Sequence, residues 1–400
     1  MKLYYKAIAQ DGKPLDGFLT ARSPSEAASF LRKQNLFPVK VVEHKEADFF
    51  SSLPARKKIS SKDRIFFTRQ LSTMLNSGLT LMQALTILRD EVEKKSFHDI
   101  IVNIITDVEA GSSLSEAVEK YPKAFSPIYV SLIKAAETSG LMDKVLDRLA
   151  TTLEQQQELR EKIKGALVYP VIVILLMVGV AILMMVMVIP QISTLYESFD
   201  VDLPLPTQIL IGMSHITITY WPLLILGGIG GGFGFVRWRK TETGRNITDR
   251  ILLKIPILGK LLSENILTEF SRTLGLLVGA GSAIVPSLRM LRDVAGNILY
   301  AKAISQASYR VEKGVTVGDA LSADPLFPPY LVQMVKIGEQ SGKLDESLMK
   351  TSTYYETEVE RTVKTLTTAM EPLIIVVLGL GVGFLLISVI TPIYQLTSVF

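Results

Sequence analysis

Residues Lys162–Pro190 read KIKGALVYPVIVILLMVGVAILMMVMVIP. From residue 168 to residue 189 this stretch has no charged side chain and no Asn or Gln. A helix needs about 20 consecutive apolar residues to cross a hydrocarbon layer about 30 Å thick. Pro170 and Pro190 stand near the two ends, where proline does not break the middle of a helix. The stretch therefore predicts a membrane-spanning helix over residues 168–189.

Two further apolar stretches predict membrane spans at residues 209–236 and 373–393. Each of the three spans has a basic flank on one side: Arg160, Lys162 and Lys164 before the first, Arg237, Arg239 and Lys240 after the second, and Arg361 and Lys364 before the third. The loop at 190–208 has acidic residues but no Lys or Arg. Because basic flanks favour the cytoplasmic side, we expect the amino terminus and the large polar segments in the cytoplasm, and the loop and the carboxy terminus outside.

The soluble sequence begins with a small predicted α/β module at residues 1–45. YYKAIA and LDGFLTA are expected to form strands around the hairpin signal Asp11-Gly12, and PVKVVE a third strand. Ser23, with Glu26 at the capping-box spacing, is expected to start the intervening helix. Residues 46–61 turn to charge, Ser and Pro, which predicts a linker.

Residues 62–164 have apolar stripes at helical spacing, interrupted by Gly78, Gly111 and Gly140. Glycine supplies the left-handed backbone conformation that ends many helices. Short connections between such helices favour an antiparallel bundle. Its last helix is expected to start at Met142 and to continue into the first span.

The bundle sequence occurs twice in the chain. FTRQLSTMLNSGLTLMQALTIL from Phe67 matches FSRTLGLLVGAGSAIVPSLRML from Phe270, and this shift of 203 residues aligns Arg69 with Arg272 and Gly78 with Gly281. ETSGLMD, which contains Glu137 and Gly140, matches EQSGKLD, which contains Glu339 and Gly342, at a shift of 202. A second bundle is therefore expected at residues 265–365. The predicted fold is mainly α, a polytopic membrane protein with two homologous cytoplasmic helical bundles, three transmembrane helices and the small α/β module.

Composition and motifs argue against an enzyme or a nucleic-acid-binding protein. The chain has 43 Lys and Arg against 39 Asp and Glu, a surplus too small for a basic binding face. It has no cysteine and only three histidines, none at zinc-ligand spacing. The nearest approach to a phosphate-binding loop, GEQSGKL from Gly338, lacks one residue between its glycines and the hydroxyl side chain after Lys343. We therefore expect no catalytic, cofactor-binding or metal-binding residues, and no cofactor.

Two pairs of charged residues are candidate partner-binding or structural positions. Glu137 and Glu339 each precede a Ser-Gly helix end, and either a contact with a partner or cation or a structural role is open to them. Capping is the favoured interpretation for the neighbouring glycines, Gly140 and Gly342. Arg69 and Arg272 lie on helices that are otherwise apolar, so an internal ion pair is favoured over docking of a partner.

The spans themselves contain small residues and one notable acid. Glycine clusters at 227–234 and 379–383 give spacings that let helices approach closely, which favours a helix interface over a substrate passage. Glu371 stands at the inner edge of the third span. It either reaches the lipid headgroups or receives a positive group of a membrane-embedded client.

Together these segments resemble a known family, the polytopic platform proteins of type II secretion systems and of type IV pilus and competence machines. The resemblance covers nearly the whole chain and depends on FTRQLSTMLNSGLTLMQAL, GSSLSEA, AETSGLMDKVL, KIKGALVYP, LPLPT and LLKIPILGKLL. It implies a non-enzymatic, multi-pass protein of the bacterial inner membrane, with loop 190–208 and the carboxy terminus periplasmic. The implied partners are a cytoplasmic hexameric ATPase, pilin or pseudopilin subunits, other inner-membrane assembly proteins, and further copies of the chain.

Two other classes of function stay open from the residues. One is a transporter or channel, against which the scarcity of polar residues in the spans argues. The other is a membrane-tethered regulatory scaffold whose bundles bind a signalling protein. The sequence does not distinguish secretion from pilus assembly, competence or another filament.

Overall fold

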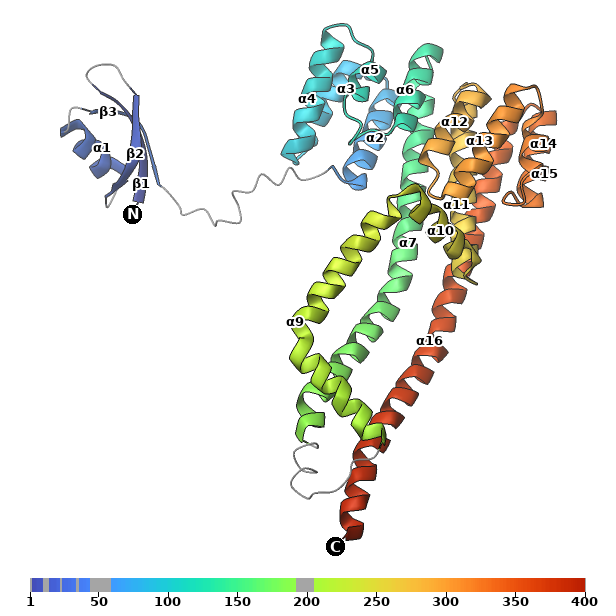
Figure 1. Cartoon of the computed structure of the whole chain (residues 1–400). Coiled ribbons are helices and arrows are strands. Elements are labelled where there is room, and N and C mark those ends of the chain that lie inside the picture. The colour runs from blue at the N-terminus through green and yellow to red at the C-terminus, as the bar shows by residue number, and fades with distance from the viewer. Residues whose placement is uncertain are drawn as a thin grey trace. The chain divides into compact units, whose positions relative to one another are not determined.

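The computed structural model describes residues 2–9, 14–21, 24–33, 36–43, 59–191 and 205–399. The chain divides into two compact units, Met1–Lys58 and Ile59–Phe400. Figure 1 shows the elements of both units.

The first unit is a three-stranded antiparallel sheet with one helix. Its elements are β1 (Lys2–Ala9), β2 (Pro14–Thr20), α1 (Pro24–Lys33) and β3 (Leu36–Glu43), and the strand order is β2-β1-β3. Ala27 and Leu31, one turn apart on α1, are buried together with Ala7 of β1. The expected turn at Asp11-Gly12, the cap at Ser23 and residues 46–58 of the expected linker lie outside the described residues.

The first repeat of the second unit is a bundle of six helices. They are α2 (Ser61–Asn76), α3 (Leu81–Glu91), α4 (Lys95–Glu109), α5 (Leu114–Glu119), α6 (Pro127–Ser139) and α7 (Met142–Leu183). Ser60, Thr80 and Ser113 start three of these helices with reciprocal capping boxes. Gly140 ends α6 at a φ of 69°, a conformation that costs other residues about 1–2 kcal/mol.

The second repeat has the same succession of helices. They are α11 (Leu258–Gly279), α12 (Ile284–Val294), α13 (Ile298–Glu312), α14 (Val317–Ser322), α15 (Pro329–Gln340) and α16 (Leu344–Val399). The positive-φ glycines of the described residues form three repeat pairs: Gly78 with Gly281, Gly111 with Gly314, and Gly140 with Gly342. The helix ends of one bundle therefore recur at the same places in the other.

An aromatic cluster lies at the centre of each bundle. In the first, the Phe67 ring centroid lies 5.7 Å from that of Phe97 and 5.7 Å from that of Phe125. The second repeat places Phe270, Tyr300 and Phe327 at the equivalent positions, and the Phe270 and Phe327 centroids are 5.5 Å apart. All six rings are buried. Burial of such side chains stabilises each by about 1.5–3 kcal/mol relative to exposure, so these rings anchor both cores.

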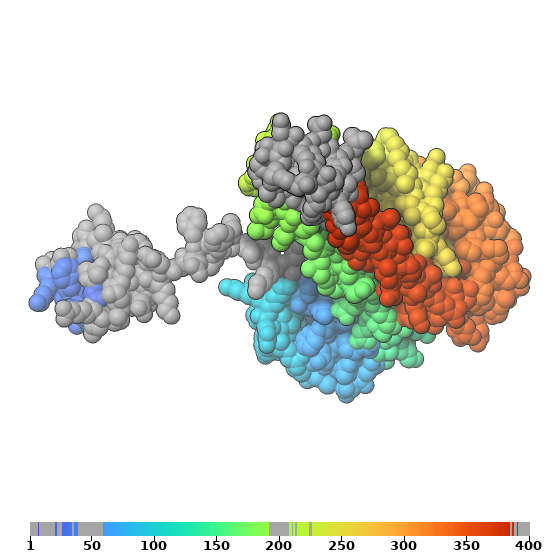
Figure 2. Space-filling view, turned by 90° about the horizontal axis from the view of Figure 1, so that it is seen from below, coloured from blue at the N-terminus to red at the C-terminus, as the bar shows by residue number. Residues whose placement is uncertain are grey.

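The last helix of each bundle continues without a break into an apolar segment (Figure 1). By length and composition, α7 with its extension to Gln191 and α16 can each cross a membrane. Pro170 is accommodated inside α7, which is followed by the π-helical turn η1 (Met184–Val188). Viewed from the far end of these helices, α7 and α16 lie between the two bundles (Figure 2).

A third candidate span is the bent helix α9 (Leu205–Arg239), whose halves Ser214–Leu223 and Leu226–Arg239 meet at 59°. The backbone of Tyr220, two residues before Pro222, leaves the helical region, as expected where a proline ring clashes with the preceding turn. The Ser214 hydroxyl donates a hydrogen bond to the Met185 carbonyl of η1. The described part of the chain thus has two candidate spans, or three if the bent helix is one span.

One helix was not expected from the sequence, and the first helix of the second bundle extends further toward the amino terminus than the predicted start of that bundle. α10 (Glu242–Lys254) follows α9, and the Thr241 hydroxyl caps it by accepting a hydrogen bond from the Gly244 amide at 3.1 Å. α11 then begins at Leu258, whereas the repeat alignment placed the second bundle from residue 265.

Candidate functional site

Arg69 and Arg272 bind equivalent glutamates in the two repeats. The Nε and Nη2 atoms of Arg69 donate to the two carboxylate oxygens of Glu154 at 2.7 and 2.5 Å. Nη2 of Arg272 donates to Oε2 of Glu356 at 2.6 Å, and Glu356 is Glu154 shifted by 202 residues. Each pair joins the first helix of a bundle to the helix that continues into the apolar segment. Both arginines therefore make internal ion pairs that fix these long helices.

The two arginines differ in their surroundings. The Arg69 side chain is 31% exposed and also binds Asp147, with 2.8 Å between Nη1 and Oδ1. The Arg272 side chain is 0% exposed, and its Nη1 lies 3.7 Å from Oε1 of Glu269. The hydrogen bonds from Arg69 lower the pKa of Glu154, whereas burial raises the pKa of Glu269. The second ion pair is thus buried and the first is at the surface.

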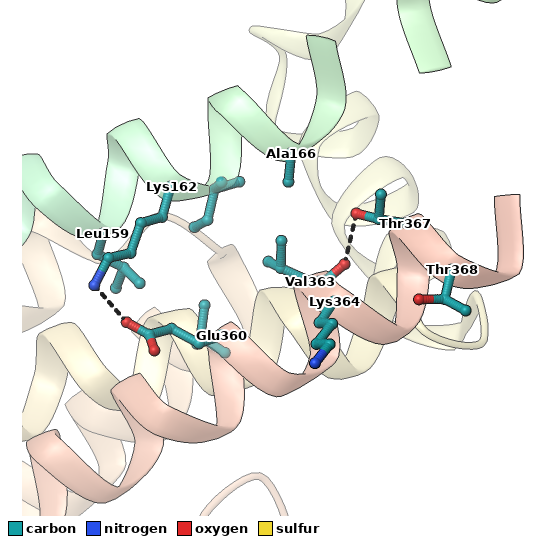
Figure 3. A pocket seen from close by; sticks show the side chains of 10 residues that line it. Leu159, Lys162, Ala166, Glu360, Val363, Lys364, Thr367 and Thr368 are labelled. Atoms are coloured by element: carbon teal, nitrogen blue, oxygen red, sulfur yellow. Dashed lines mark hydrogen bonds and ion pairs between the residues drawn. The ribbon is translucent and has the colours of Figure 1, made fainter. Parts of the chain in front are cut away.

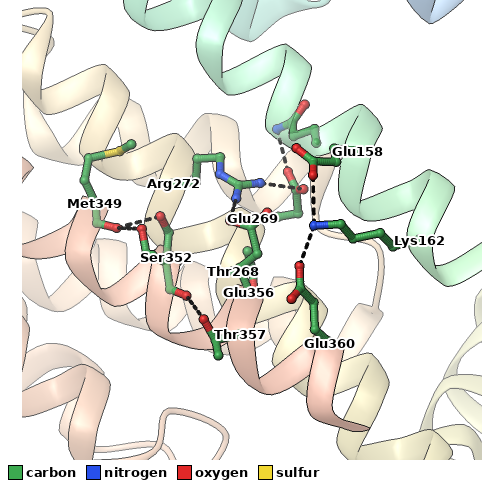
Figure 4. A network of polar contacts seen from close by, with 12 residues as sticks. Glu158, Lys162, Thr268, Glu269, Arg272, Met349, Ser352, Glu356, Thr357 and Glu360 are labelled. Atoms are coloured by element: carbon green, nitrogen blue, oxygen red, sulfur yellow. Dashed lines mark hydrogen bonds and ion pairs between the residues drawn. The ribbon is translucent and has the colours of Figure 1, made fainter. Parts of the chain in front are cut away.

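Arg272 is buried because α7 of the first repeat lies across α11 and α16 of the second (Figure 4). Lys162 of α7 binds Glu360 of α16 with 2.8 Å between Nζ and Oε1, and binds Glu158 of its own helix at 2.9 Å. Gln156 of α7 donates to Oε2 of Glu269 at 2.6 Å. We call this contact the inter-repeat seam; its members are Arg148, Gln156, Leu159 and Lys162 of α7, and Glu269, Asp345, Val359, Glu360 and Val363 of α11 and α16.

A pocket of about 360 Å³ opens beside the seam, between α7 and α16 (Figure 3). The ion pair of Lys162 and Glu360 forms one wall, and Ala166 and Val363 lie deeper between the helices. The described residues contain no cluster of three or more His, Asp or Glu side chains that could hold a metal ion. This mixture of apolar side chains and one ion pair suits contact with another helix or with lipid.

Glu137 and Glu339 each bind the start of the short fourth helix in their own bundle, α5 or α14. Glu137 accepts hydrogen bonds from the backbone amides of Leu114 and Ser115, at 2.5 and 3.2 Å. Glu339 accepts them from the amides of residues 317 and 318, at 2.9 and 3.2 Å. A carboxylate at a helix N-terminus satisfies unpaired amides and is favoured by the helix dipole. The duplicated glutamates therefore tie α6 to α5 and α15 to α14.

The remaining candidate positions lie apart from the seam. Gly78 and Gly281 are at the turn after the first helix of each repeat, with φ of 89° and 84°, and Gly140 and Gly342 are at the end of α6 and α15 with φ of 69°. Glu371 is exposed on α16 directly before Pro372, and within the described residues it makes no hydrogen bond or ion pair. The structure does not bring the nine candidate residues into one site.

Sequence reasoning missed the glutamate partners of the two arginines and the role of Lys162 in the seam. Glu154 and Glu356 are separated from their arginines by more than 80 residues, so no local spacing indicates the pairing. The repeat alone could have indicated this pairing, because both an arginine and a glutamate recur at nearly the same shift. Lys162 was noted only as a basic residue beside the first span.

Comparison with known families supports the duplication. The family described as "Type II secretion system (T2SS), protein F" matches residues 67–190 and again residues 270–392. "Type II secretion system protein F, N-terminal domain" matches residues 4–42. The repeat predicted from the sequence is confirmed by this double match.

Full-length relatives agree with these matches. The chain is 38% identical over 395 residues to a type IV pilus assembly protein PilC of Thermus thermophilus, covering 98% of this chain and 97% of the relative. It is 35% identical to the PilC of Pseudomonas aeruginosa, covering 92% and 98% of the two chains. It is 32% identical to a type II secretion system protein F of Xanthomonas campestris, covering 100% and 99%. The chain therefore belongs to the type II secretion system protein F family, as the sequence motifs had indicated.

Proposed function

We propose that this protein is a non-enzymatic inner-membrane platform of a type II secretion or type IV pilus-like machine. In this role it couples a cytoplasmic hexameric ATPase to the insertion of pilin or pseudopilin subunits into a filament. The observation that carries the proposal is the continuity of α7 and α16, each of which is one helix from its bundle into an apolar span. A displacement of either bundle is thereby transmitted to the membrane segment without an intervening loop.

The two bundles are the proposed contact surfaces for the motor and for other inner-membrane assembly proteins of the machine. Their inner faces are filled by the aromatic clusters, and their outer faces carry charged side chains together with exposed apolar ones such as Tyr309 and Ile337. The internal ion pairs of Arg69 and Arg272 keep each bundle attached to its long helix, so a force on the bundle is not lost in a hinge. The positive-inside rule supports a cytoplasmic location for both bundles and a periplasmic carboxy terminus.

The apolar spans are the proposed contact surface for pilin or pseudopilin helices. The glycines of α9 between residues 227 and 234, and those of α16 at 379, 381 and 383, have no other atoms near the position of an added Cβ. Such exposed small residues let a second helix approach closely in lipid. Glu371 at the edge of α16 is available to a positive group of such a client.

The experiment is complementation of a strain that lacks its own platform protein. The wild-type chain is expected to restore filament assembly or substrate export. Replacing Glu356 and Arg272 together with apolar residues of similar size tests whether the buried pair is needed beyond stability, since such exchanges are often neutral for folding. Restoration by chains that insert in the membrane but lack either bundle surface would contradict the proposal.

A further inference from the structure

The first repeat leaves open the surface that corresponds to the covered surface of the second. In the second repeat, α7 lies over α11 and α16 and buries Arg272. The equivalent surface of the first repeat, on α2 and α7, is an open groove of about 490 Å³ lined by Lys62, Ile65, Phe66, Arg69, Gln70, Glu154, Gln157, Glu158 and Glu161. The exposure of Arg69, 31% against 0% for Arg272, reflects the lack of a covering helix in the first repeat.

In the repeat alignment, one exposed face of helix α16 is equivalent to the face of α7 that packs against α11 and α16 in the seam. The shift of 202 residues relates Arg148 to Lys350, Leu159 to Arg361, and Lys162 to Lys364. Lys350, Arg361 and Lys364 are all exposed in the structure. The charged positions of one half of the seam are therefore exposed on α16, and those of the other half are exposed on α7, where Glu158 and Glu161 also pair with Lys162 and Lys62 of their own chain.

We propose that these free halves bind each other between two copies of the chain, so that α16 of one copy lies in the α2–α7 groove of the next. This contact between two chains would have the same arrangement of helices as the seam within each chain. It is a heterologous contact, in which two different surfaces meet. The proposal holds for any machine that the protein serves.

Three charged positions of α16 lie opposite acids of the first repeat in the register of the seam, whereas the seam pair Gln156 and Glu269 corresponds to Glu358 and Phe66. Within the chain, Lys162 binds Glu360 at 2.8 Å. In the equivalent contact between copies, Lys364 of one copy takes the place of Lys162, and Glu158 of the next copy takes the place of Glu360. A lysine therefore still meets a glutamate. The seam pair Arg148 and Asp345, 3.5 Å apart, likewise becomes a pair of Lys350 with Asp143.

The apolar centre of the seam is replaced by a third pair of opposite charges. Leu159 packs against Val359 and Val363 within the chain. The equivalent residues between copies are Arg361 on α16 and, in the groove, Gln157 and Glu161. The Arg361 side chain pairs with Glu358 of its own helix at 2.7 Å and is 71% exposed, so a neighbouring copy can still reach its guanidinium. A lysine or arginine of α16 thus meets an acid of α7 at three positions along the helix.

The directions of the helices allow this contact to recur in a membrane. α7 and α16 run the same way from their bundles into the apolar segments (Figure 1). A rotation that superposes one repeat on the other therefore keeps the spans parallel. Copies joined in this way all cross one bilayer in the same orientation. A heterologous contact of this kind closes into a ring when the rotation between successive copies is a whole fraction of a full turn.

The test is cysteine cross-linking, because the wild-type chain has no cysteine. Gln157→Cys on one tagged copy and Arg361→Cys on a differently tagged copy are purified as full chains and reconstituted together in lipid vesicles. Oxidation is expected to give a heterodimer that contains both tags, at least tenfold above the dimer formed by either variant alone. A chain with both substitutions is expected to give a ladder of dimers and larger species.

The matched control is Leu159→Cys with Val359→Cys in one chain, the equivalent positions of the internal seam. This pair is expected to close within the chain and to leave the protein monomeric on a denaturing gel. If the control closes but no heterodimer forms, the proposal is wrong. Self-linking of Gln157→Cys alone would also contradict it, because that product requires a two-fold contact between identical grooves.

A charge exchange tests the register independently. Glu158→Lys in the copy that carries Gln157→Cys, or Lys364→Glu in the copy that carries Arg361→Cys, is expected to reduce the heterodimer yield several-fold. The two exchanges together, one in each copy, place opposite charges at the contact again and are expected to restore the yield. Equal yields in all four combinations would show that these residues do not meet.

Discussion

Arg272 and Glu356 form a salt bridge of 2.6 Å in the interior of the protein, and the equivalent pair of the first repeat, Arg69 and Glu154, lies at the surface. Duplication has thus placed one interaction in two environments. The buried pair is enclosed by α7, with Gln156 and Glu269 beside it. Variants of the two pairs therefore measure, within one protein, how much an ion pair contributes to stability at the surface and how much in the interior.

Removing the buried acid should destabilise the protein far more than removing its surface counterpart. Glu356→Ala leaves a guanidinium in the interior without its main partner, which costs about 3–5 kcal/mol. Glu154→Ala removes a solvent-exposed pair, which costs about 1 kcal/mol or less. Thermal unfolding of the full chain in detergent measures both. Equal losses of melting temperature would contradict the burial of Arg272.

The glutamates at the short helices should protect particular backbone amides. Glu137→Ala is expected to cost about 1–3 kcal/mol because the amides at the start of α5 lose their acceptor. Hydrogen exchange should become faster at Leu114 and Ser115. Glu119→Ala, an exposed change at the other end of α5, serves as control and should stay within about 0.5 kcal/mol. Unchanged exchange in the Glu137 variant would show that the carboxylate is not the cap.

Substitution by alanine should have opposite effects on stability at a glycine with positive φ and at a glycine inside a helix. Gly140→Ala forces a side chain into a left-handed conformation and should cost about 1–2 kcal/mol. Gly165→Ala lies within α7, where an added Cβ meets no other atom, and should stabilise the protein by about 0.5–1 kcal/mol. The melting temperatures of the two variants should therefore move in opposite directions. A loss from Gly165→Ala would indicate a contact on that face of α7.

The seam should respond to pH through Glu269. Burial raises its pKa above the ordinary value of 4.5. The unfolded chain, in which Glu269 has the ordinary pKa, loses this proton at a lower pH than the folded chain does. The contribution of Glu269 to stability therefore falls as the pH rises above the unfolded-state pKa. Glu269→Gln removes this contribution and keeps an acceptor for Gln156. The melting temperature of the variant relative to wild type should therefore increase as the pH rises above about 4.5; a difference that is constant with pH would contradict the raised pKa.

The repeat and the helix ends were predictable from the sequence because they depend on local signals. Glycines such as Gly78 and Gly281 mark turns that require a positive φ, and they keep their spacing in both copies. The apolar stretch after Lys164 predicted the continuation of α7. Helix α10 was missed because its short amphipathic pattern follows a span directly, although Thr241 offers the cap.

The seam was not predictable from local pattern. Its contacts join residues more than 100 positions apart, such as Lys162 and Glu360, and their charges look like those of any solvated helix face. Glu137 and Glu339 were left open for a related reason. A carboxylate in the last turn of a helix opposes that helix's dipole, and only the tertiary fold reveals the start of another helix within reach.

The central claim is that the protein transmits the work of a separate motor and performs no hydrolysis itself. The most direct measurement combines the full chain in lipid nanodiscs with the secretion ATPase of the same cell, and follows binding and ATP hydrolysis together. The account predicts that the ATPase binds to the nanodiscs through the two bundles and that the chain without the ATPase hydrolyses no ATP. Hydrolysis by the purified chain alone, or nanodiscs that bind no ATPase, would contradict it.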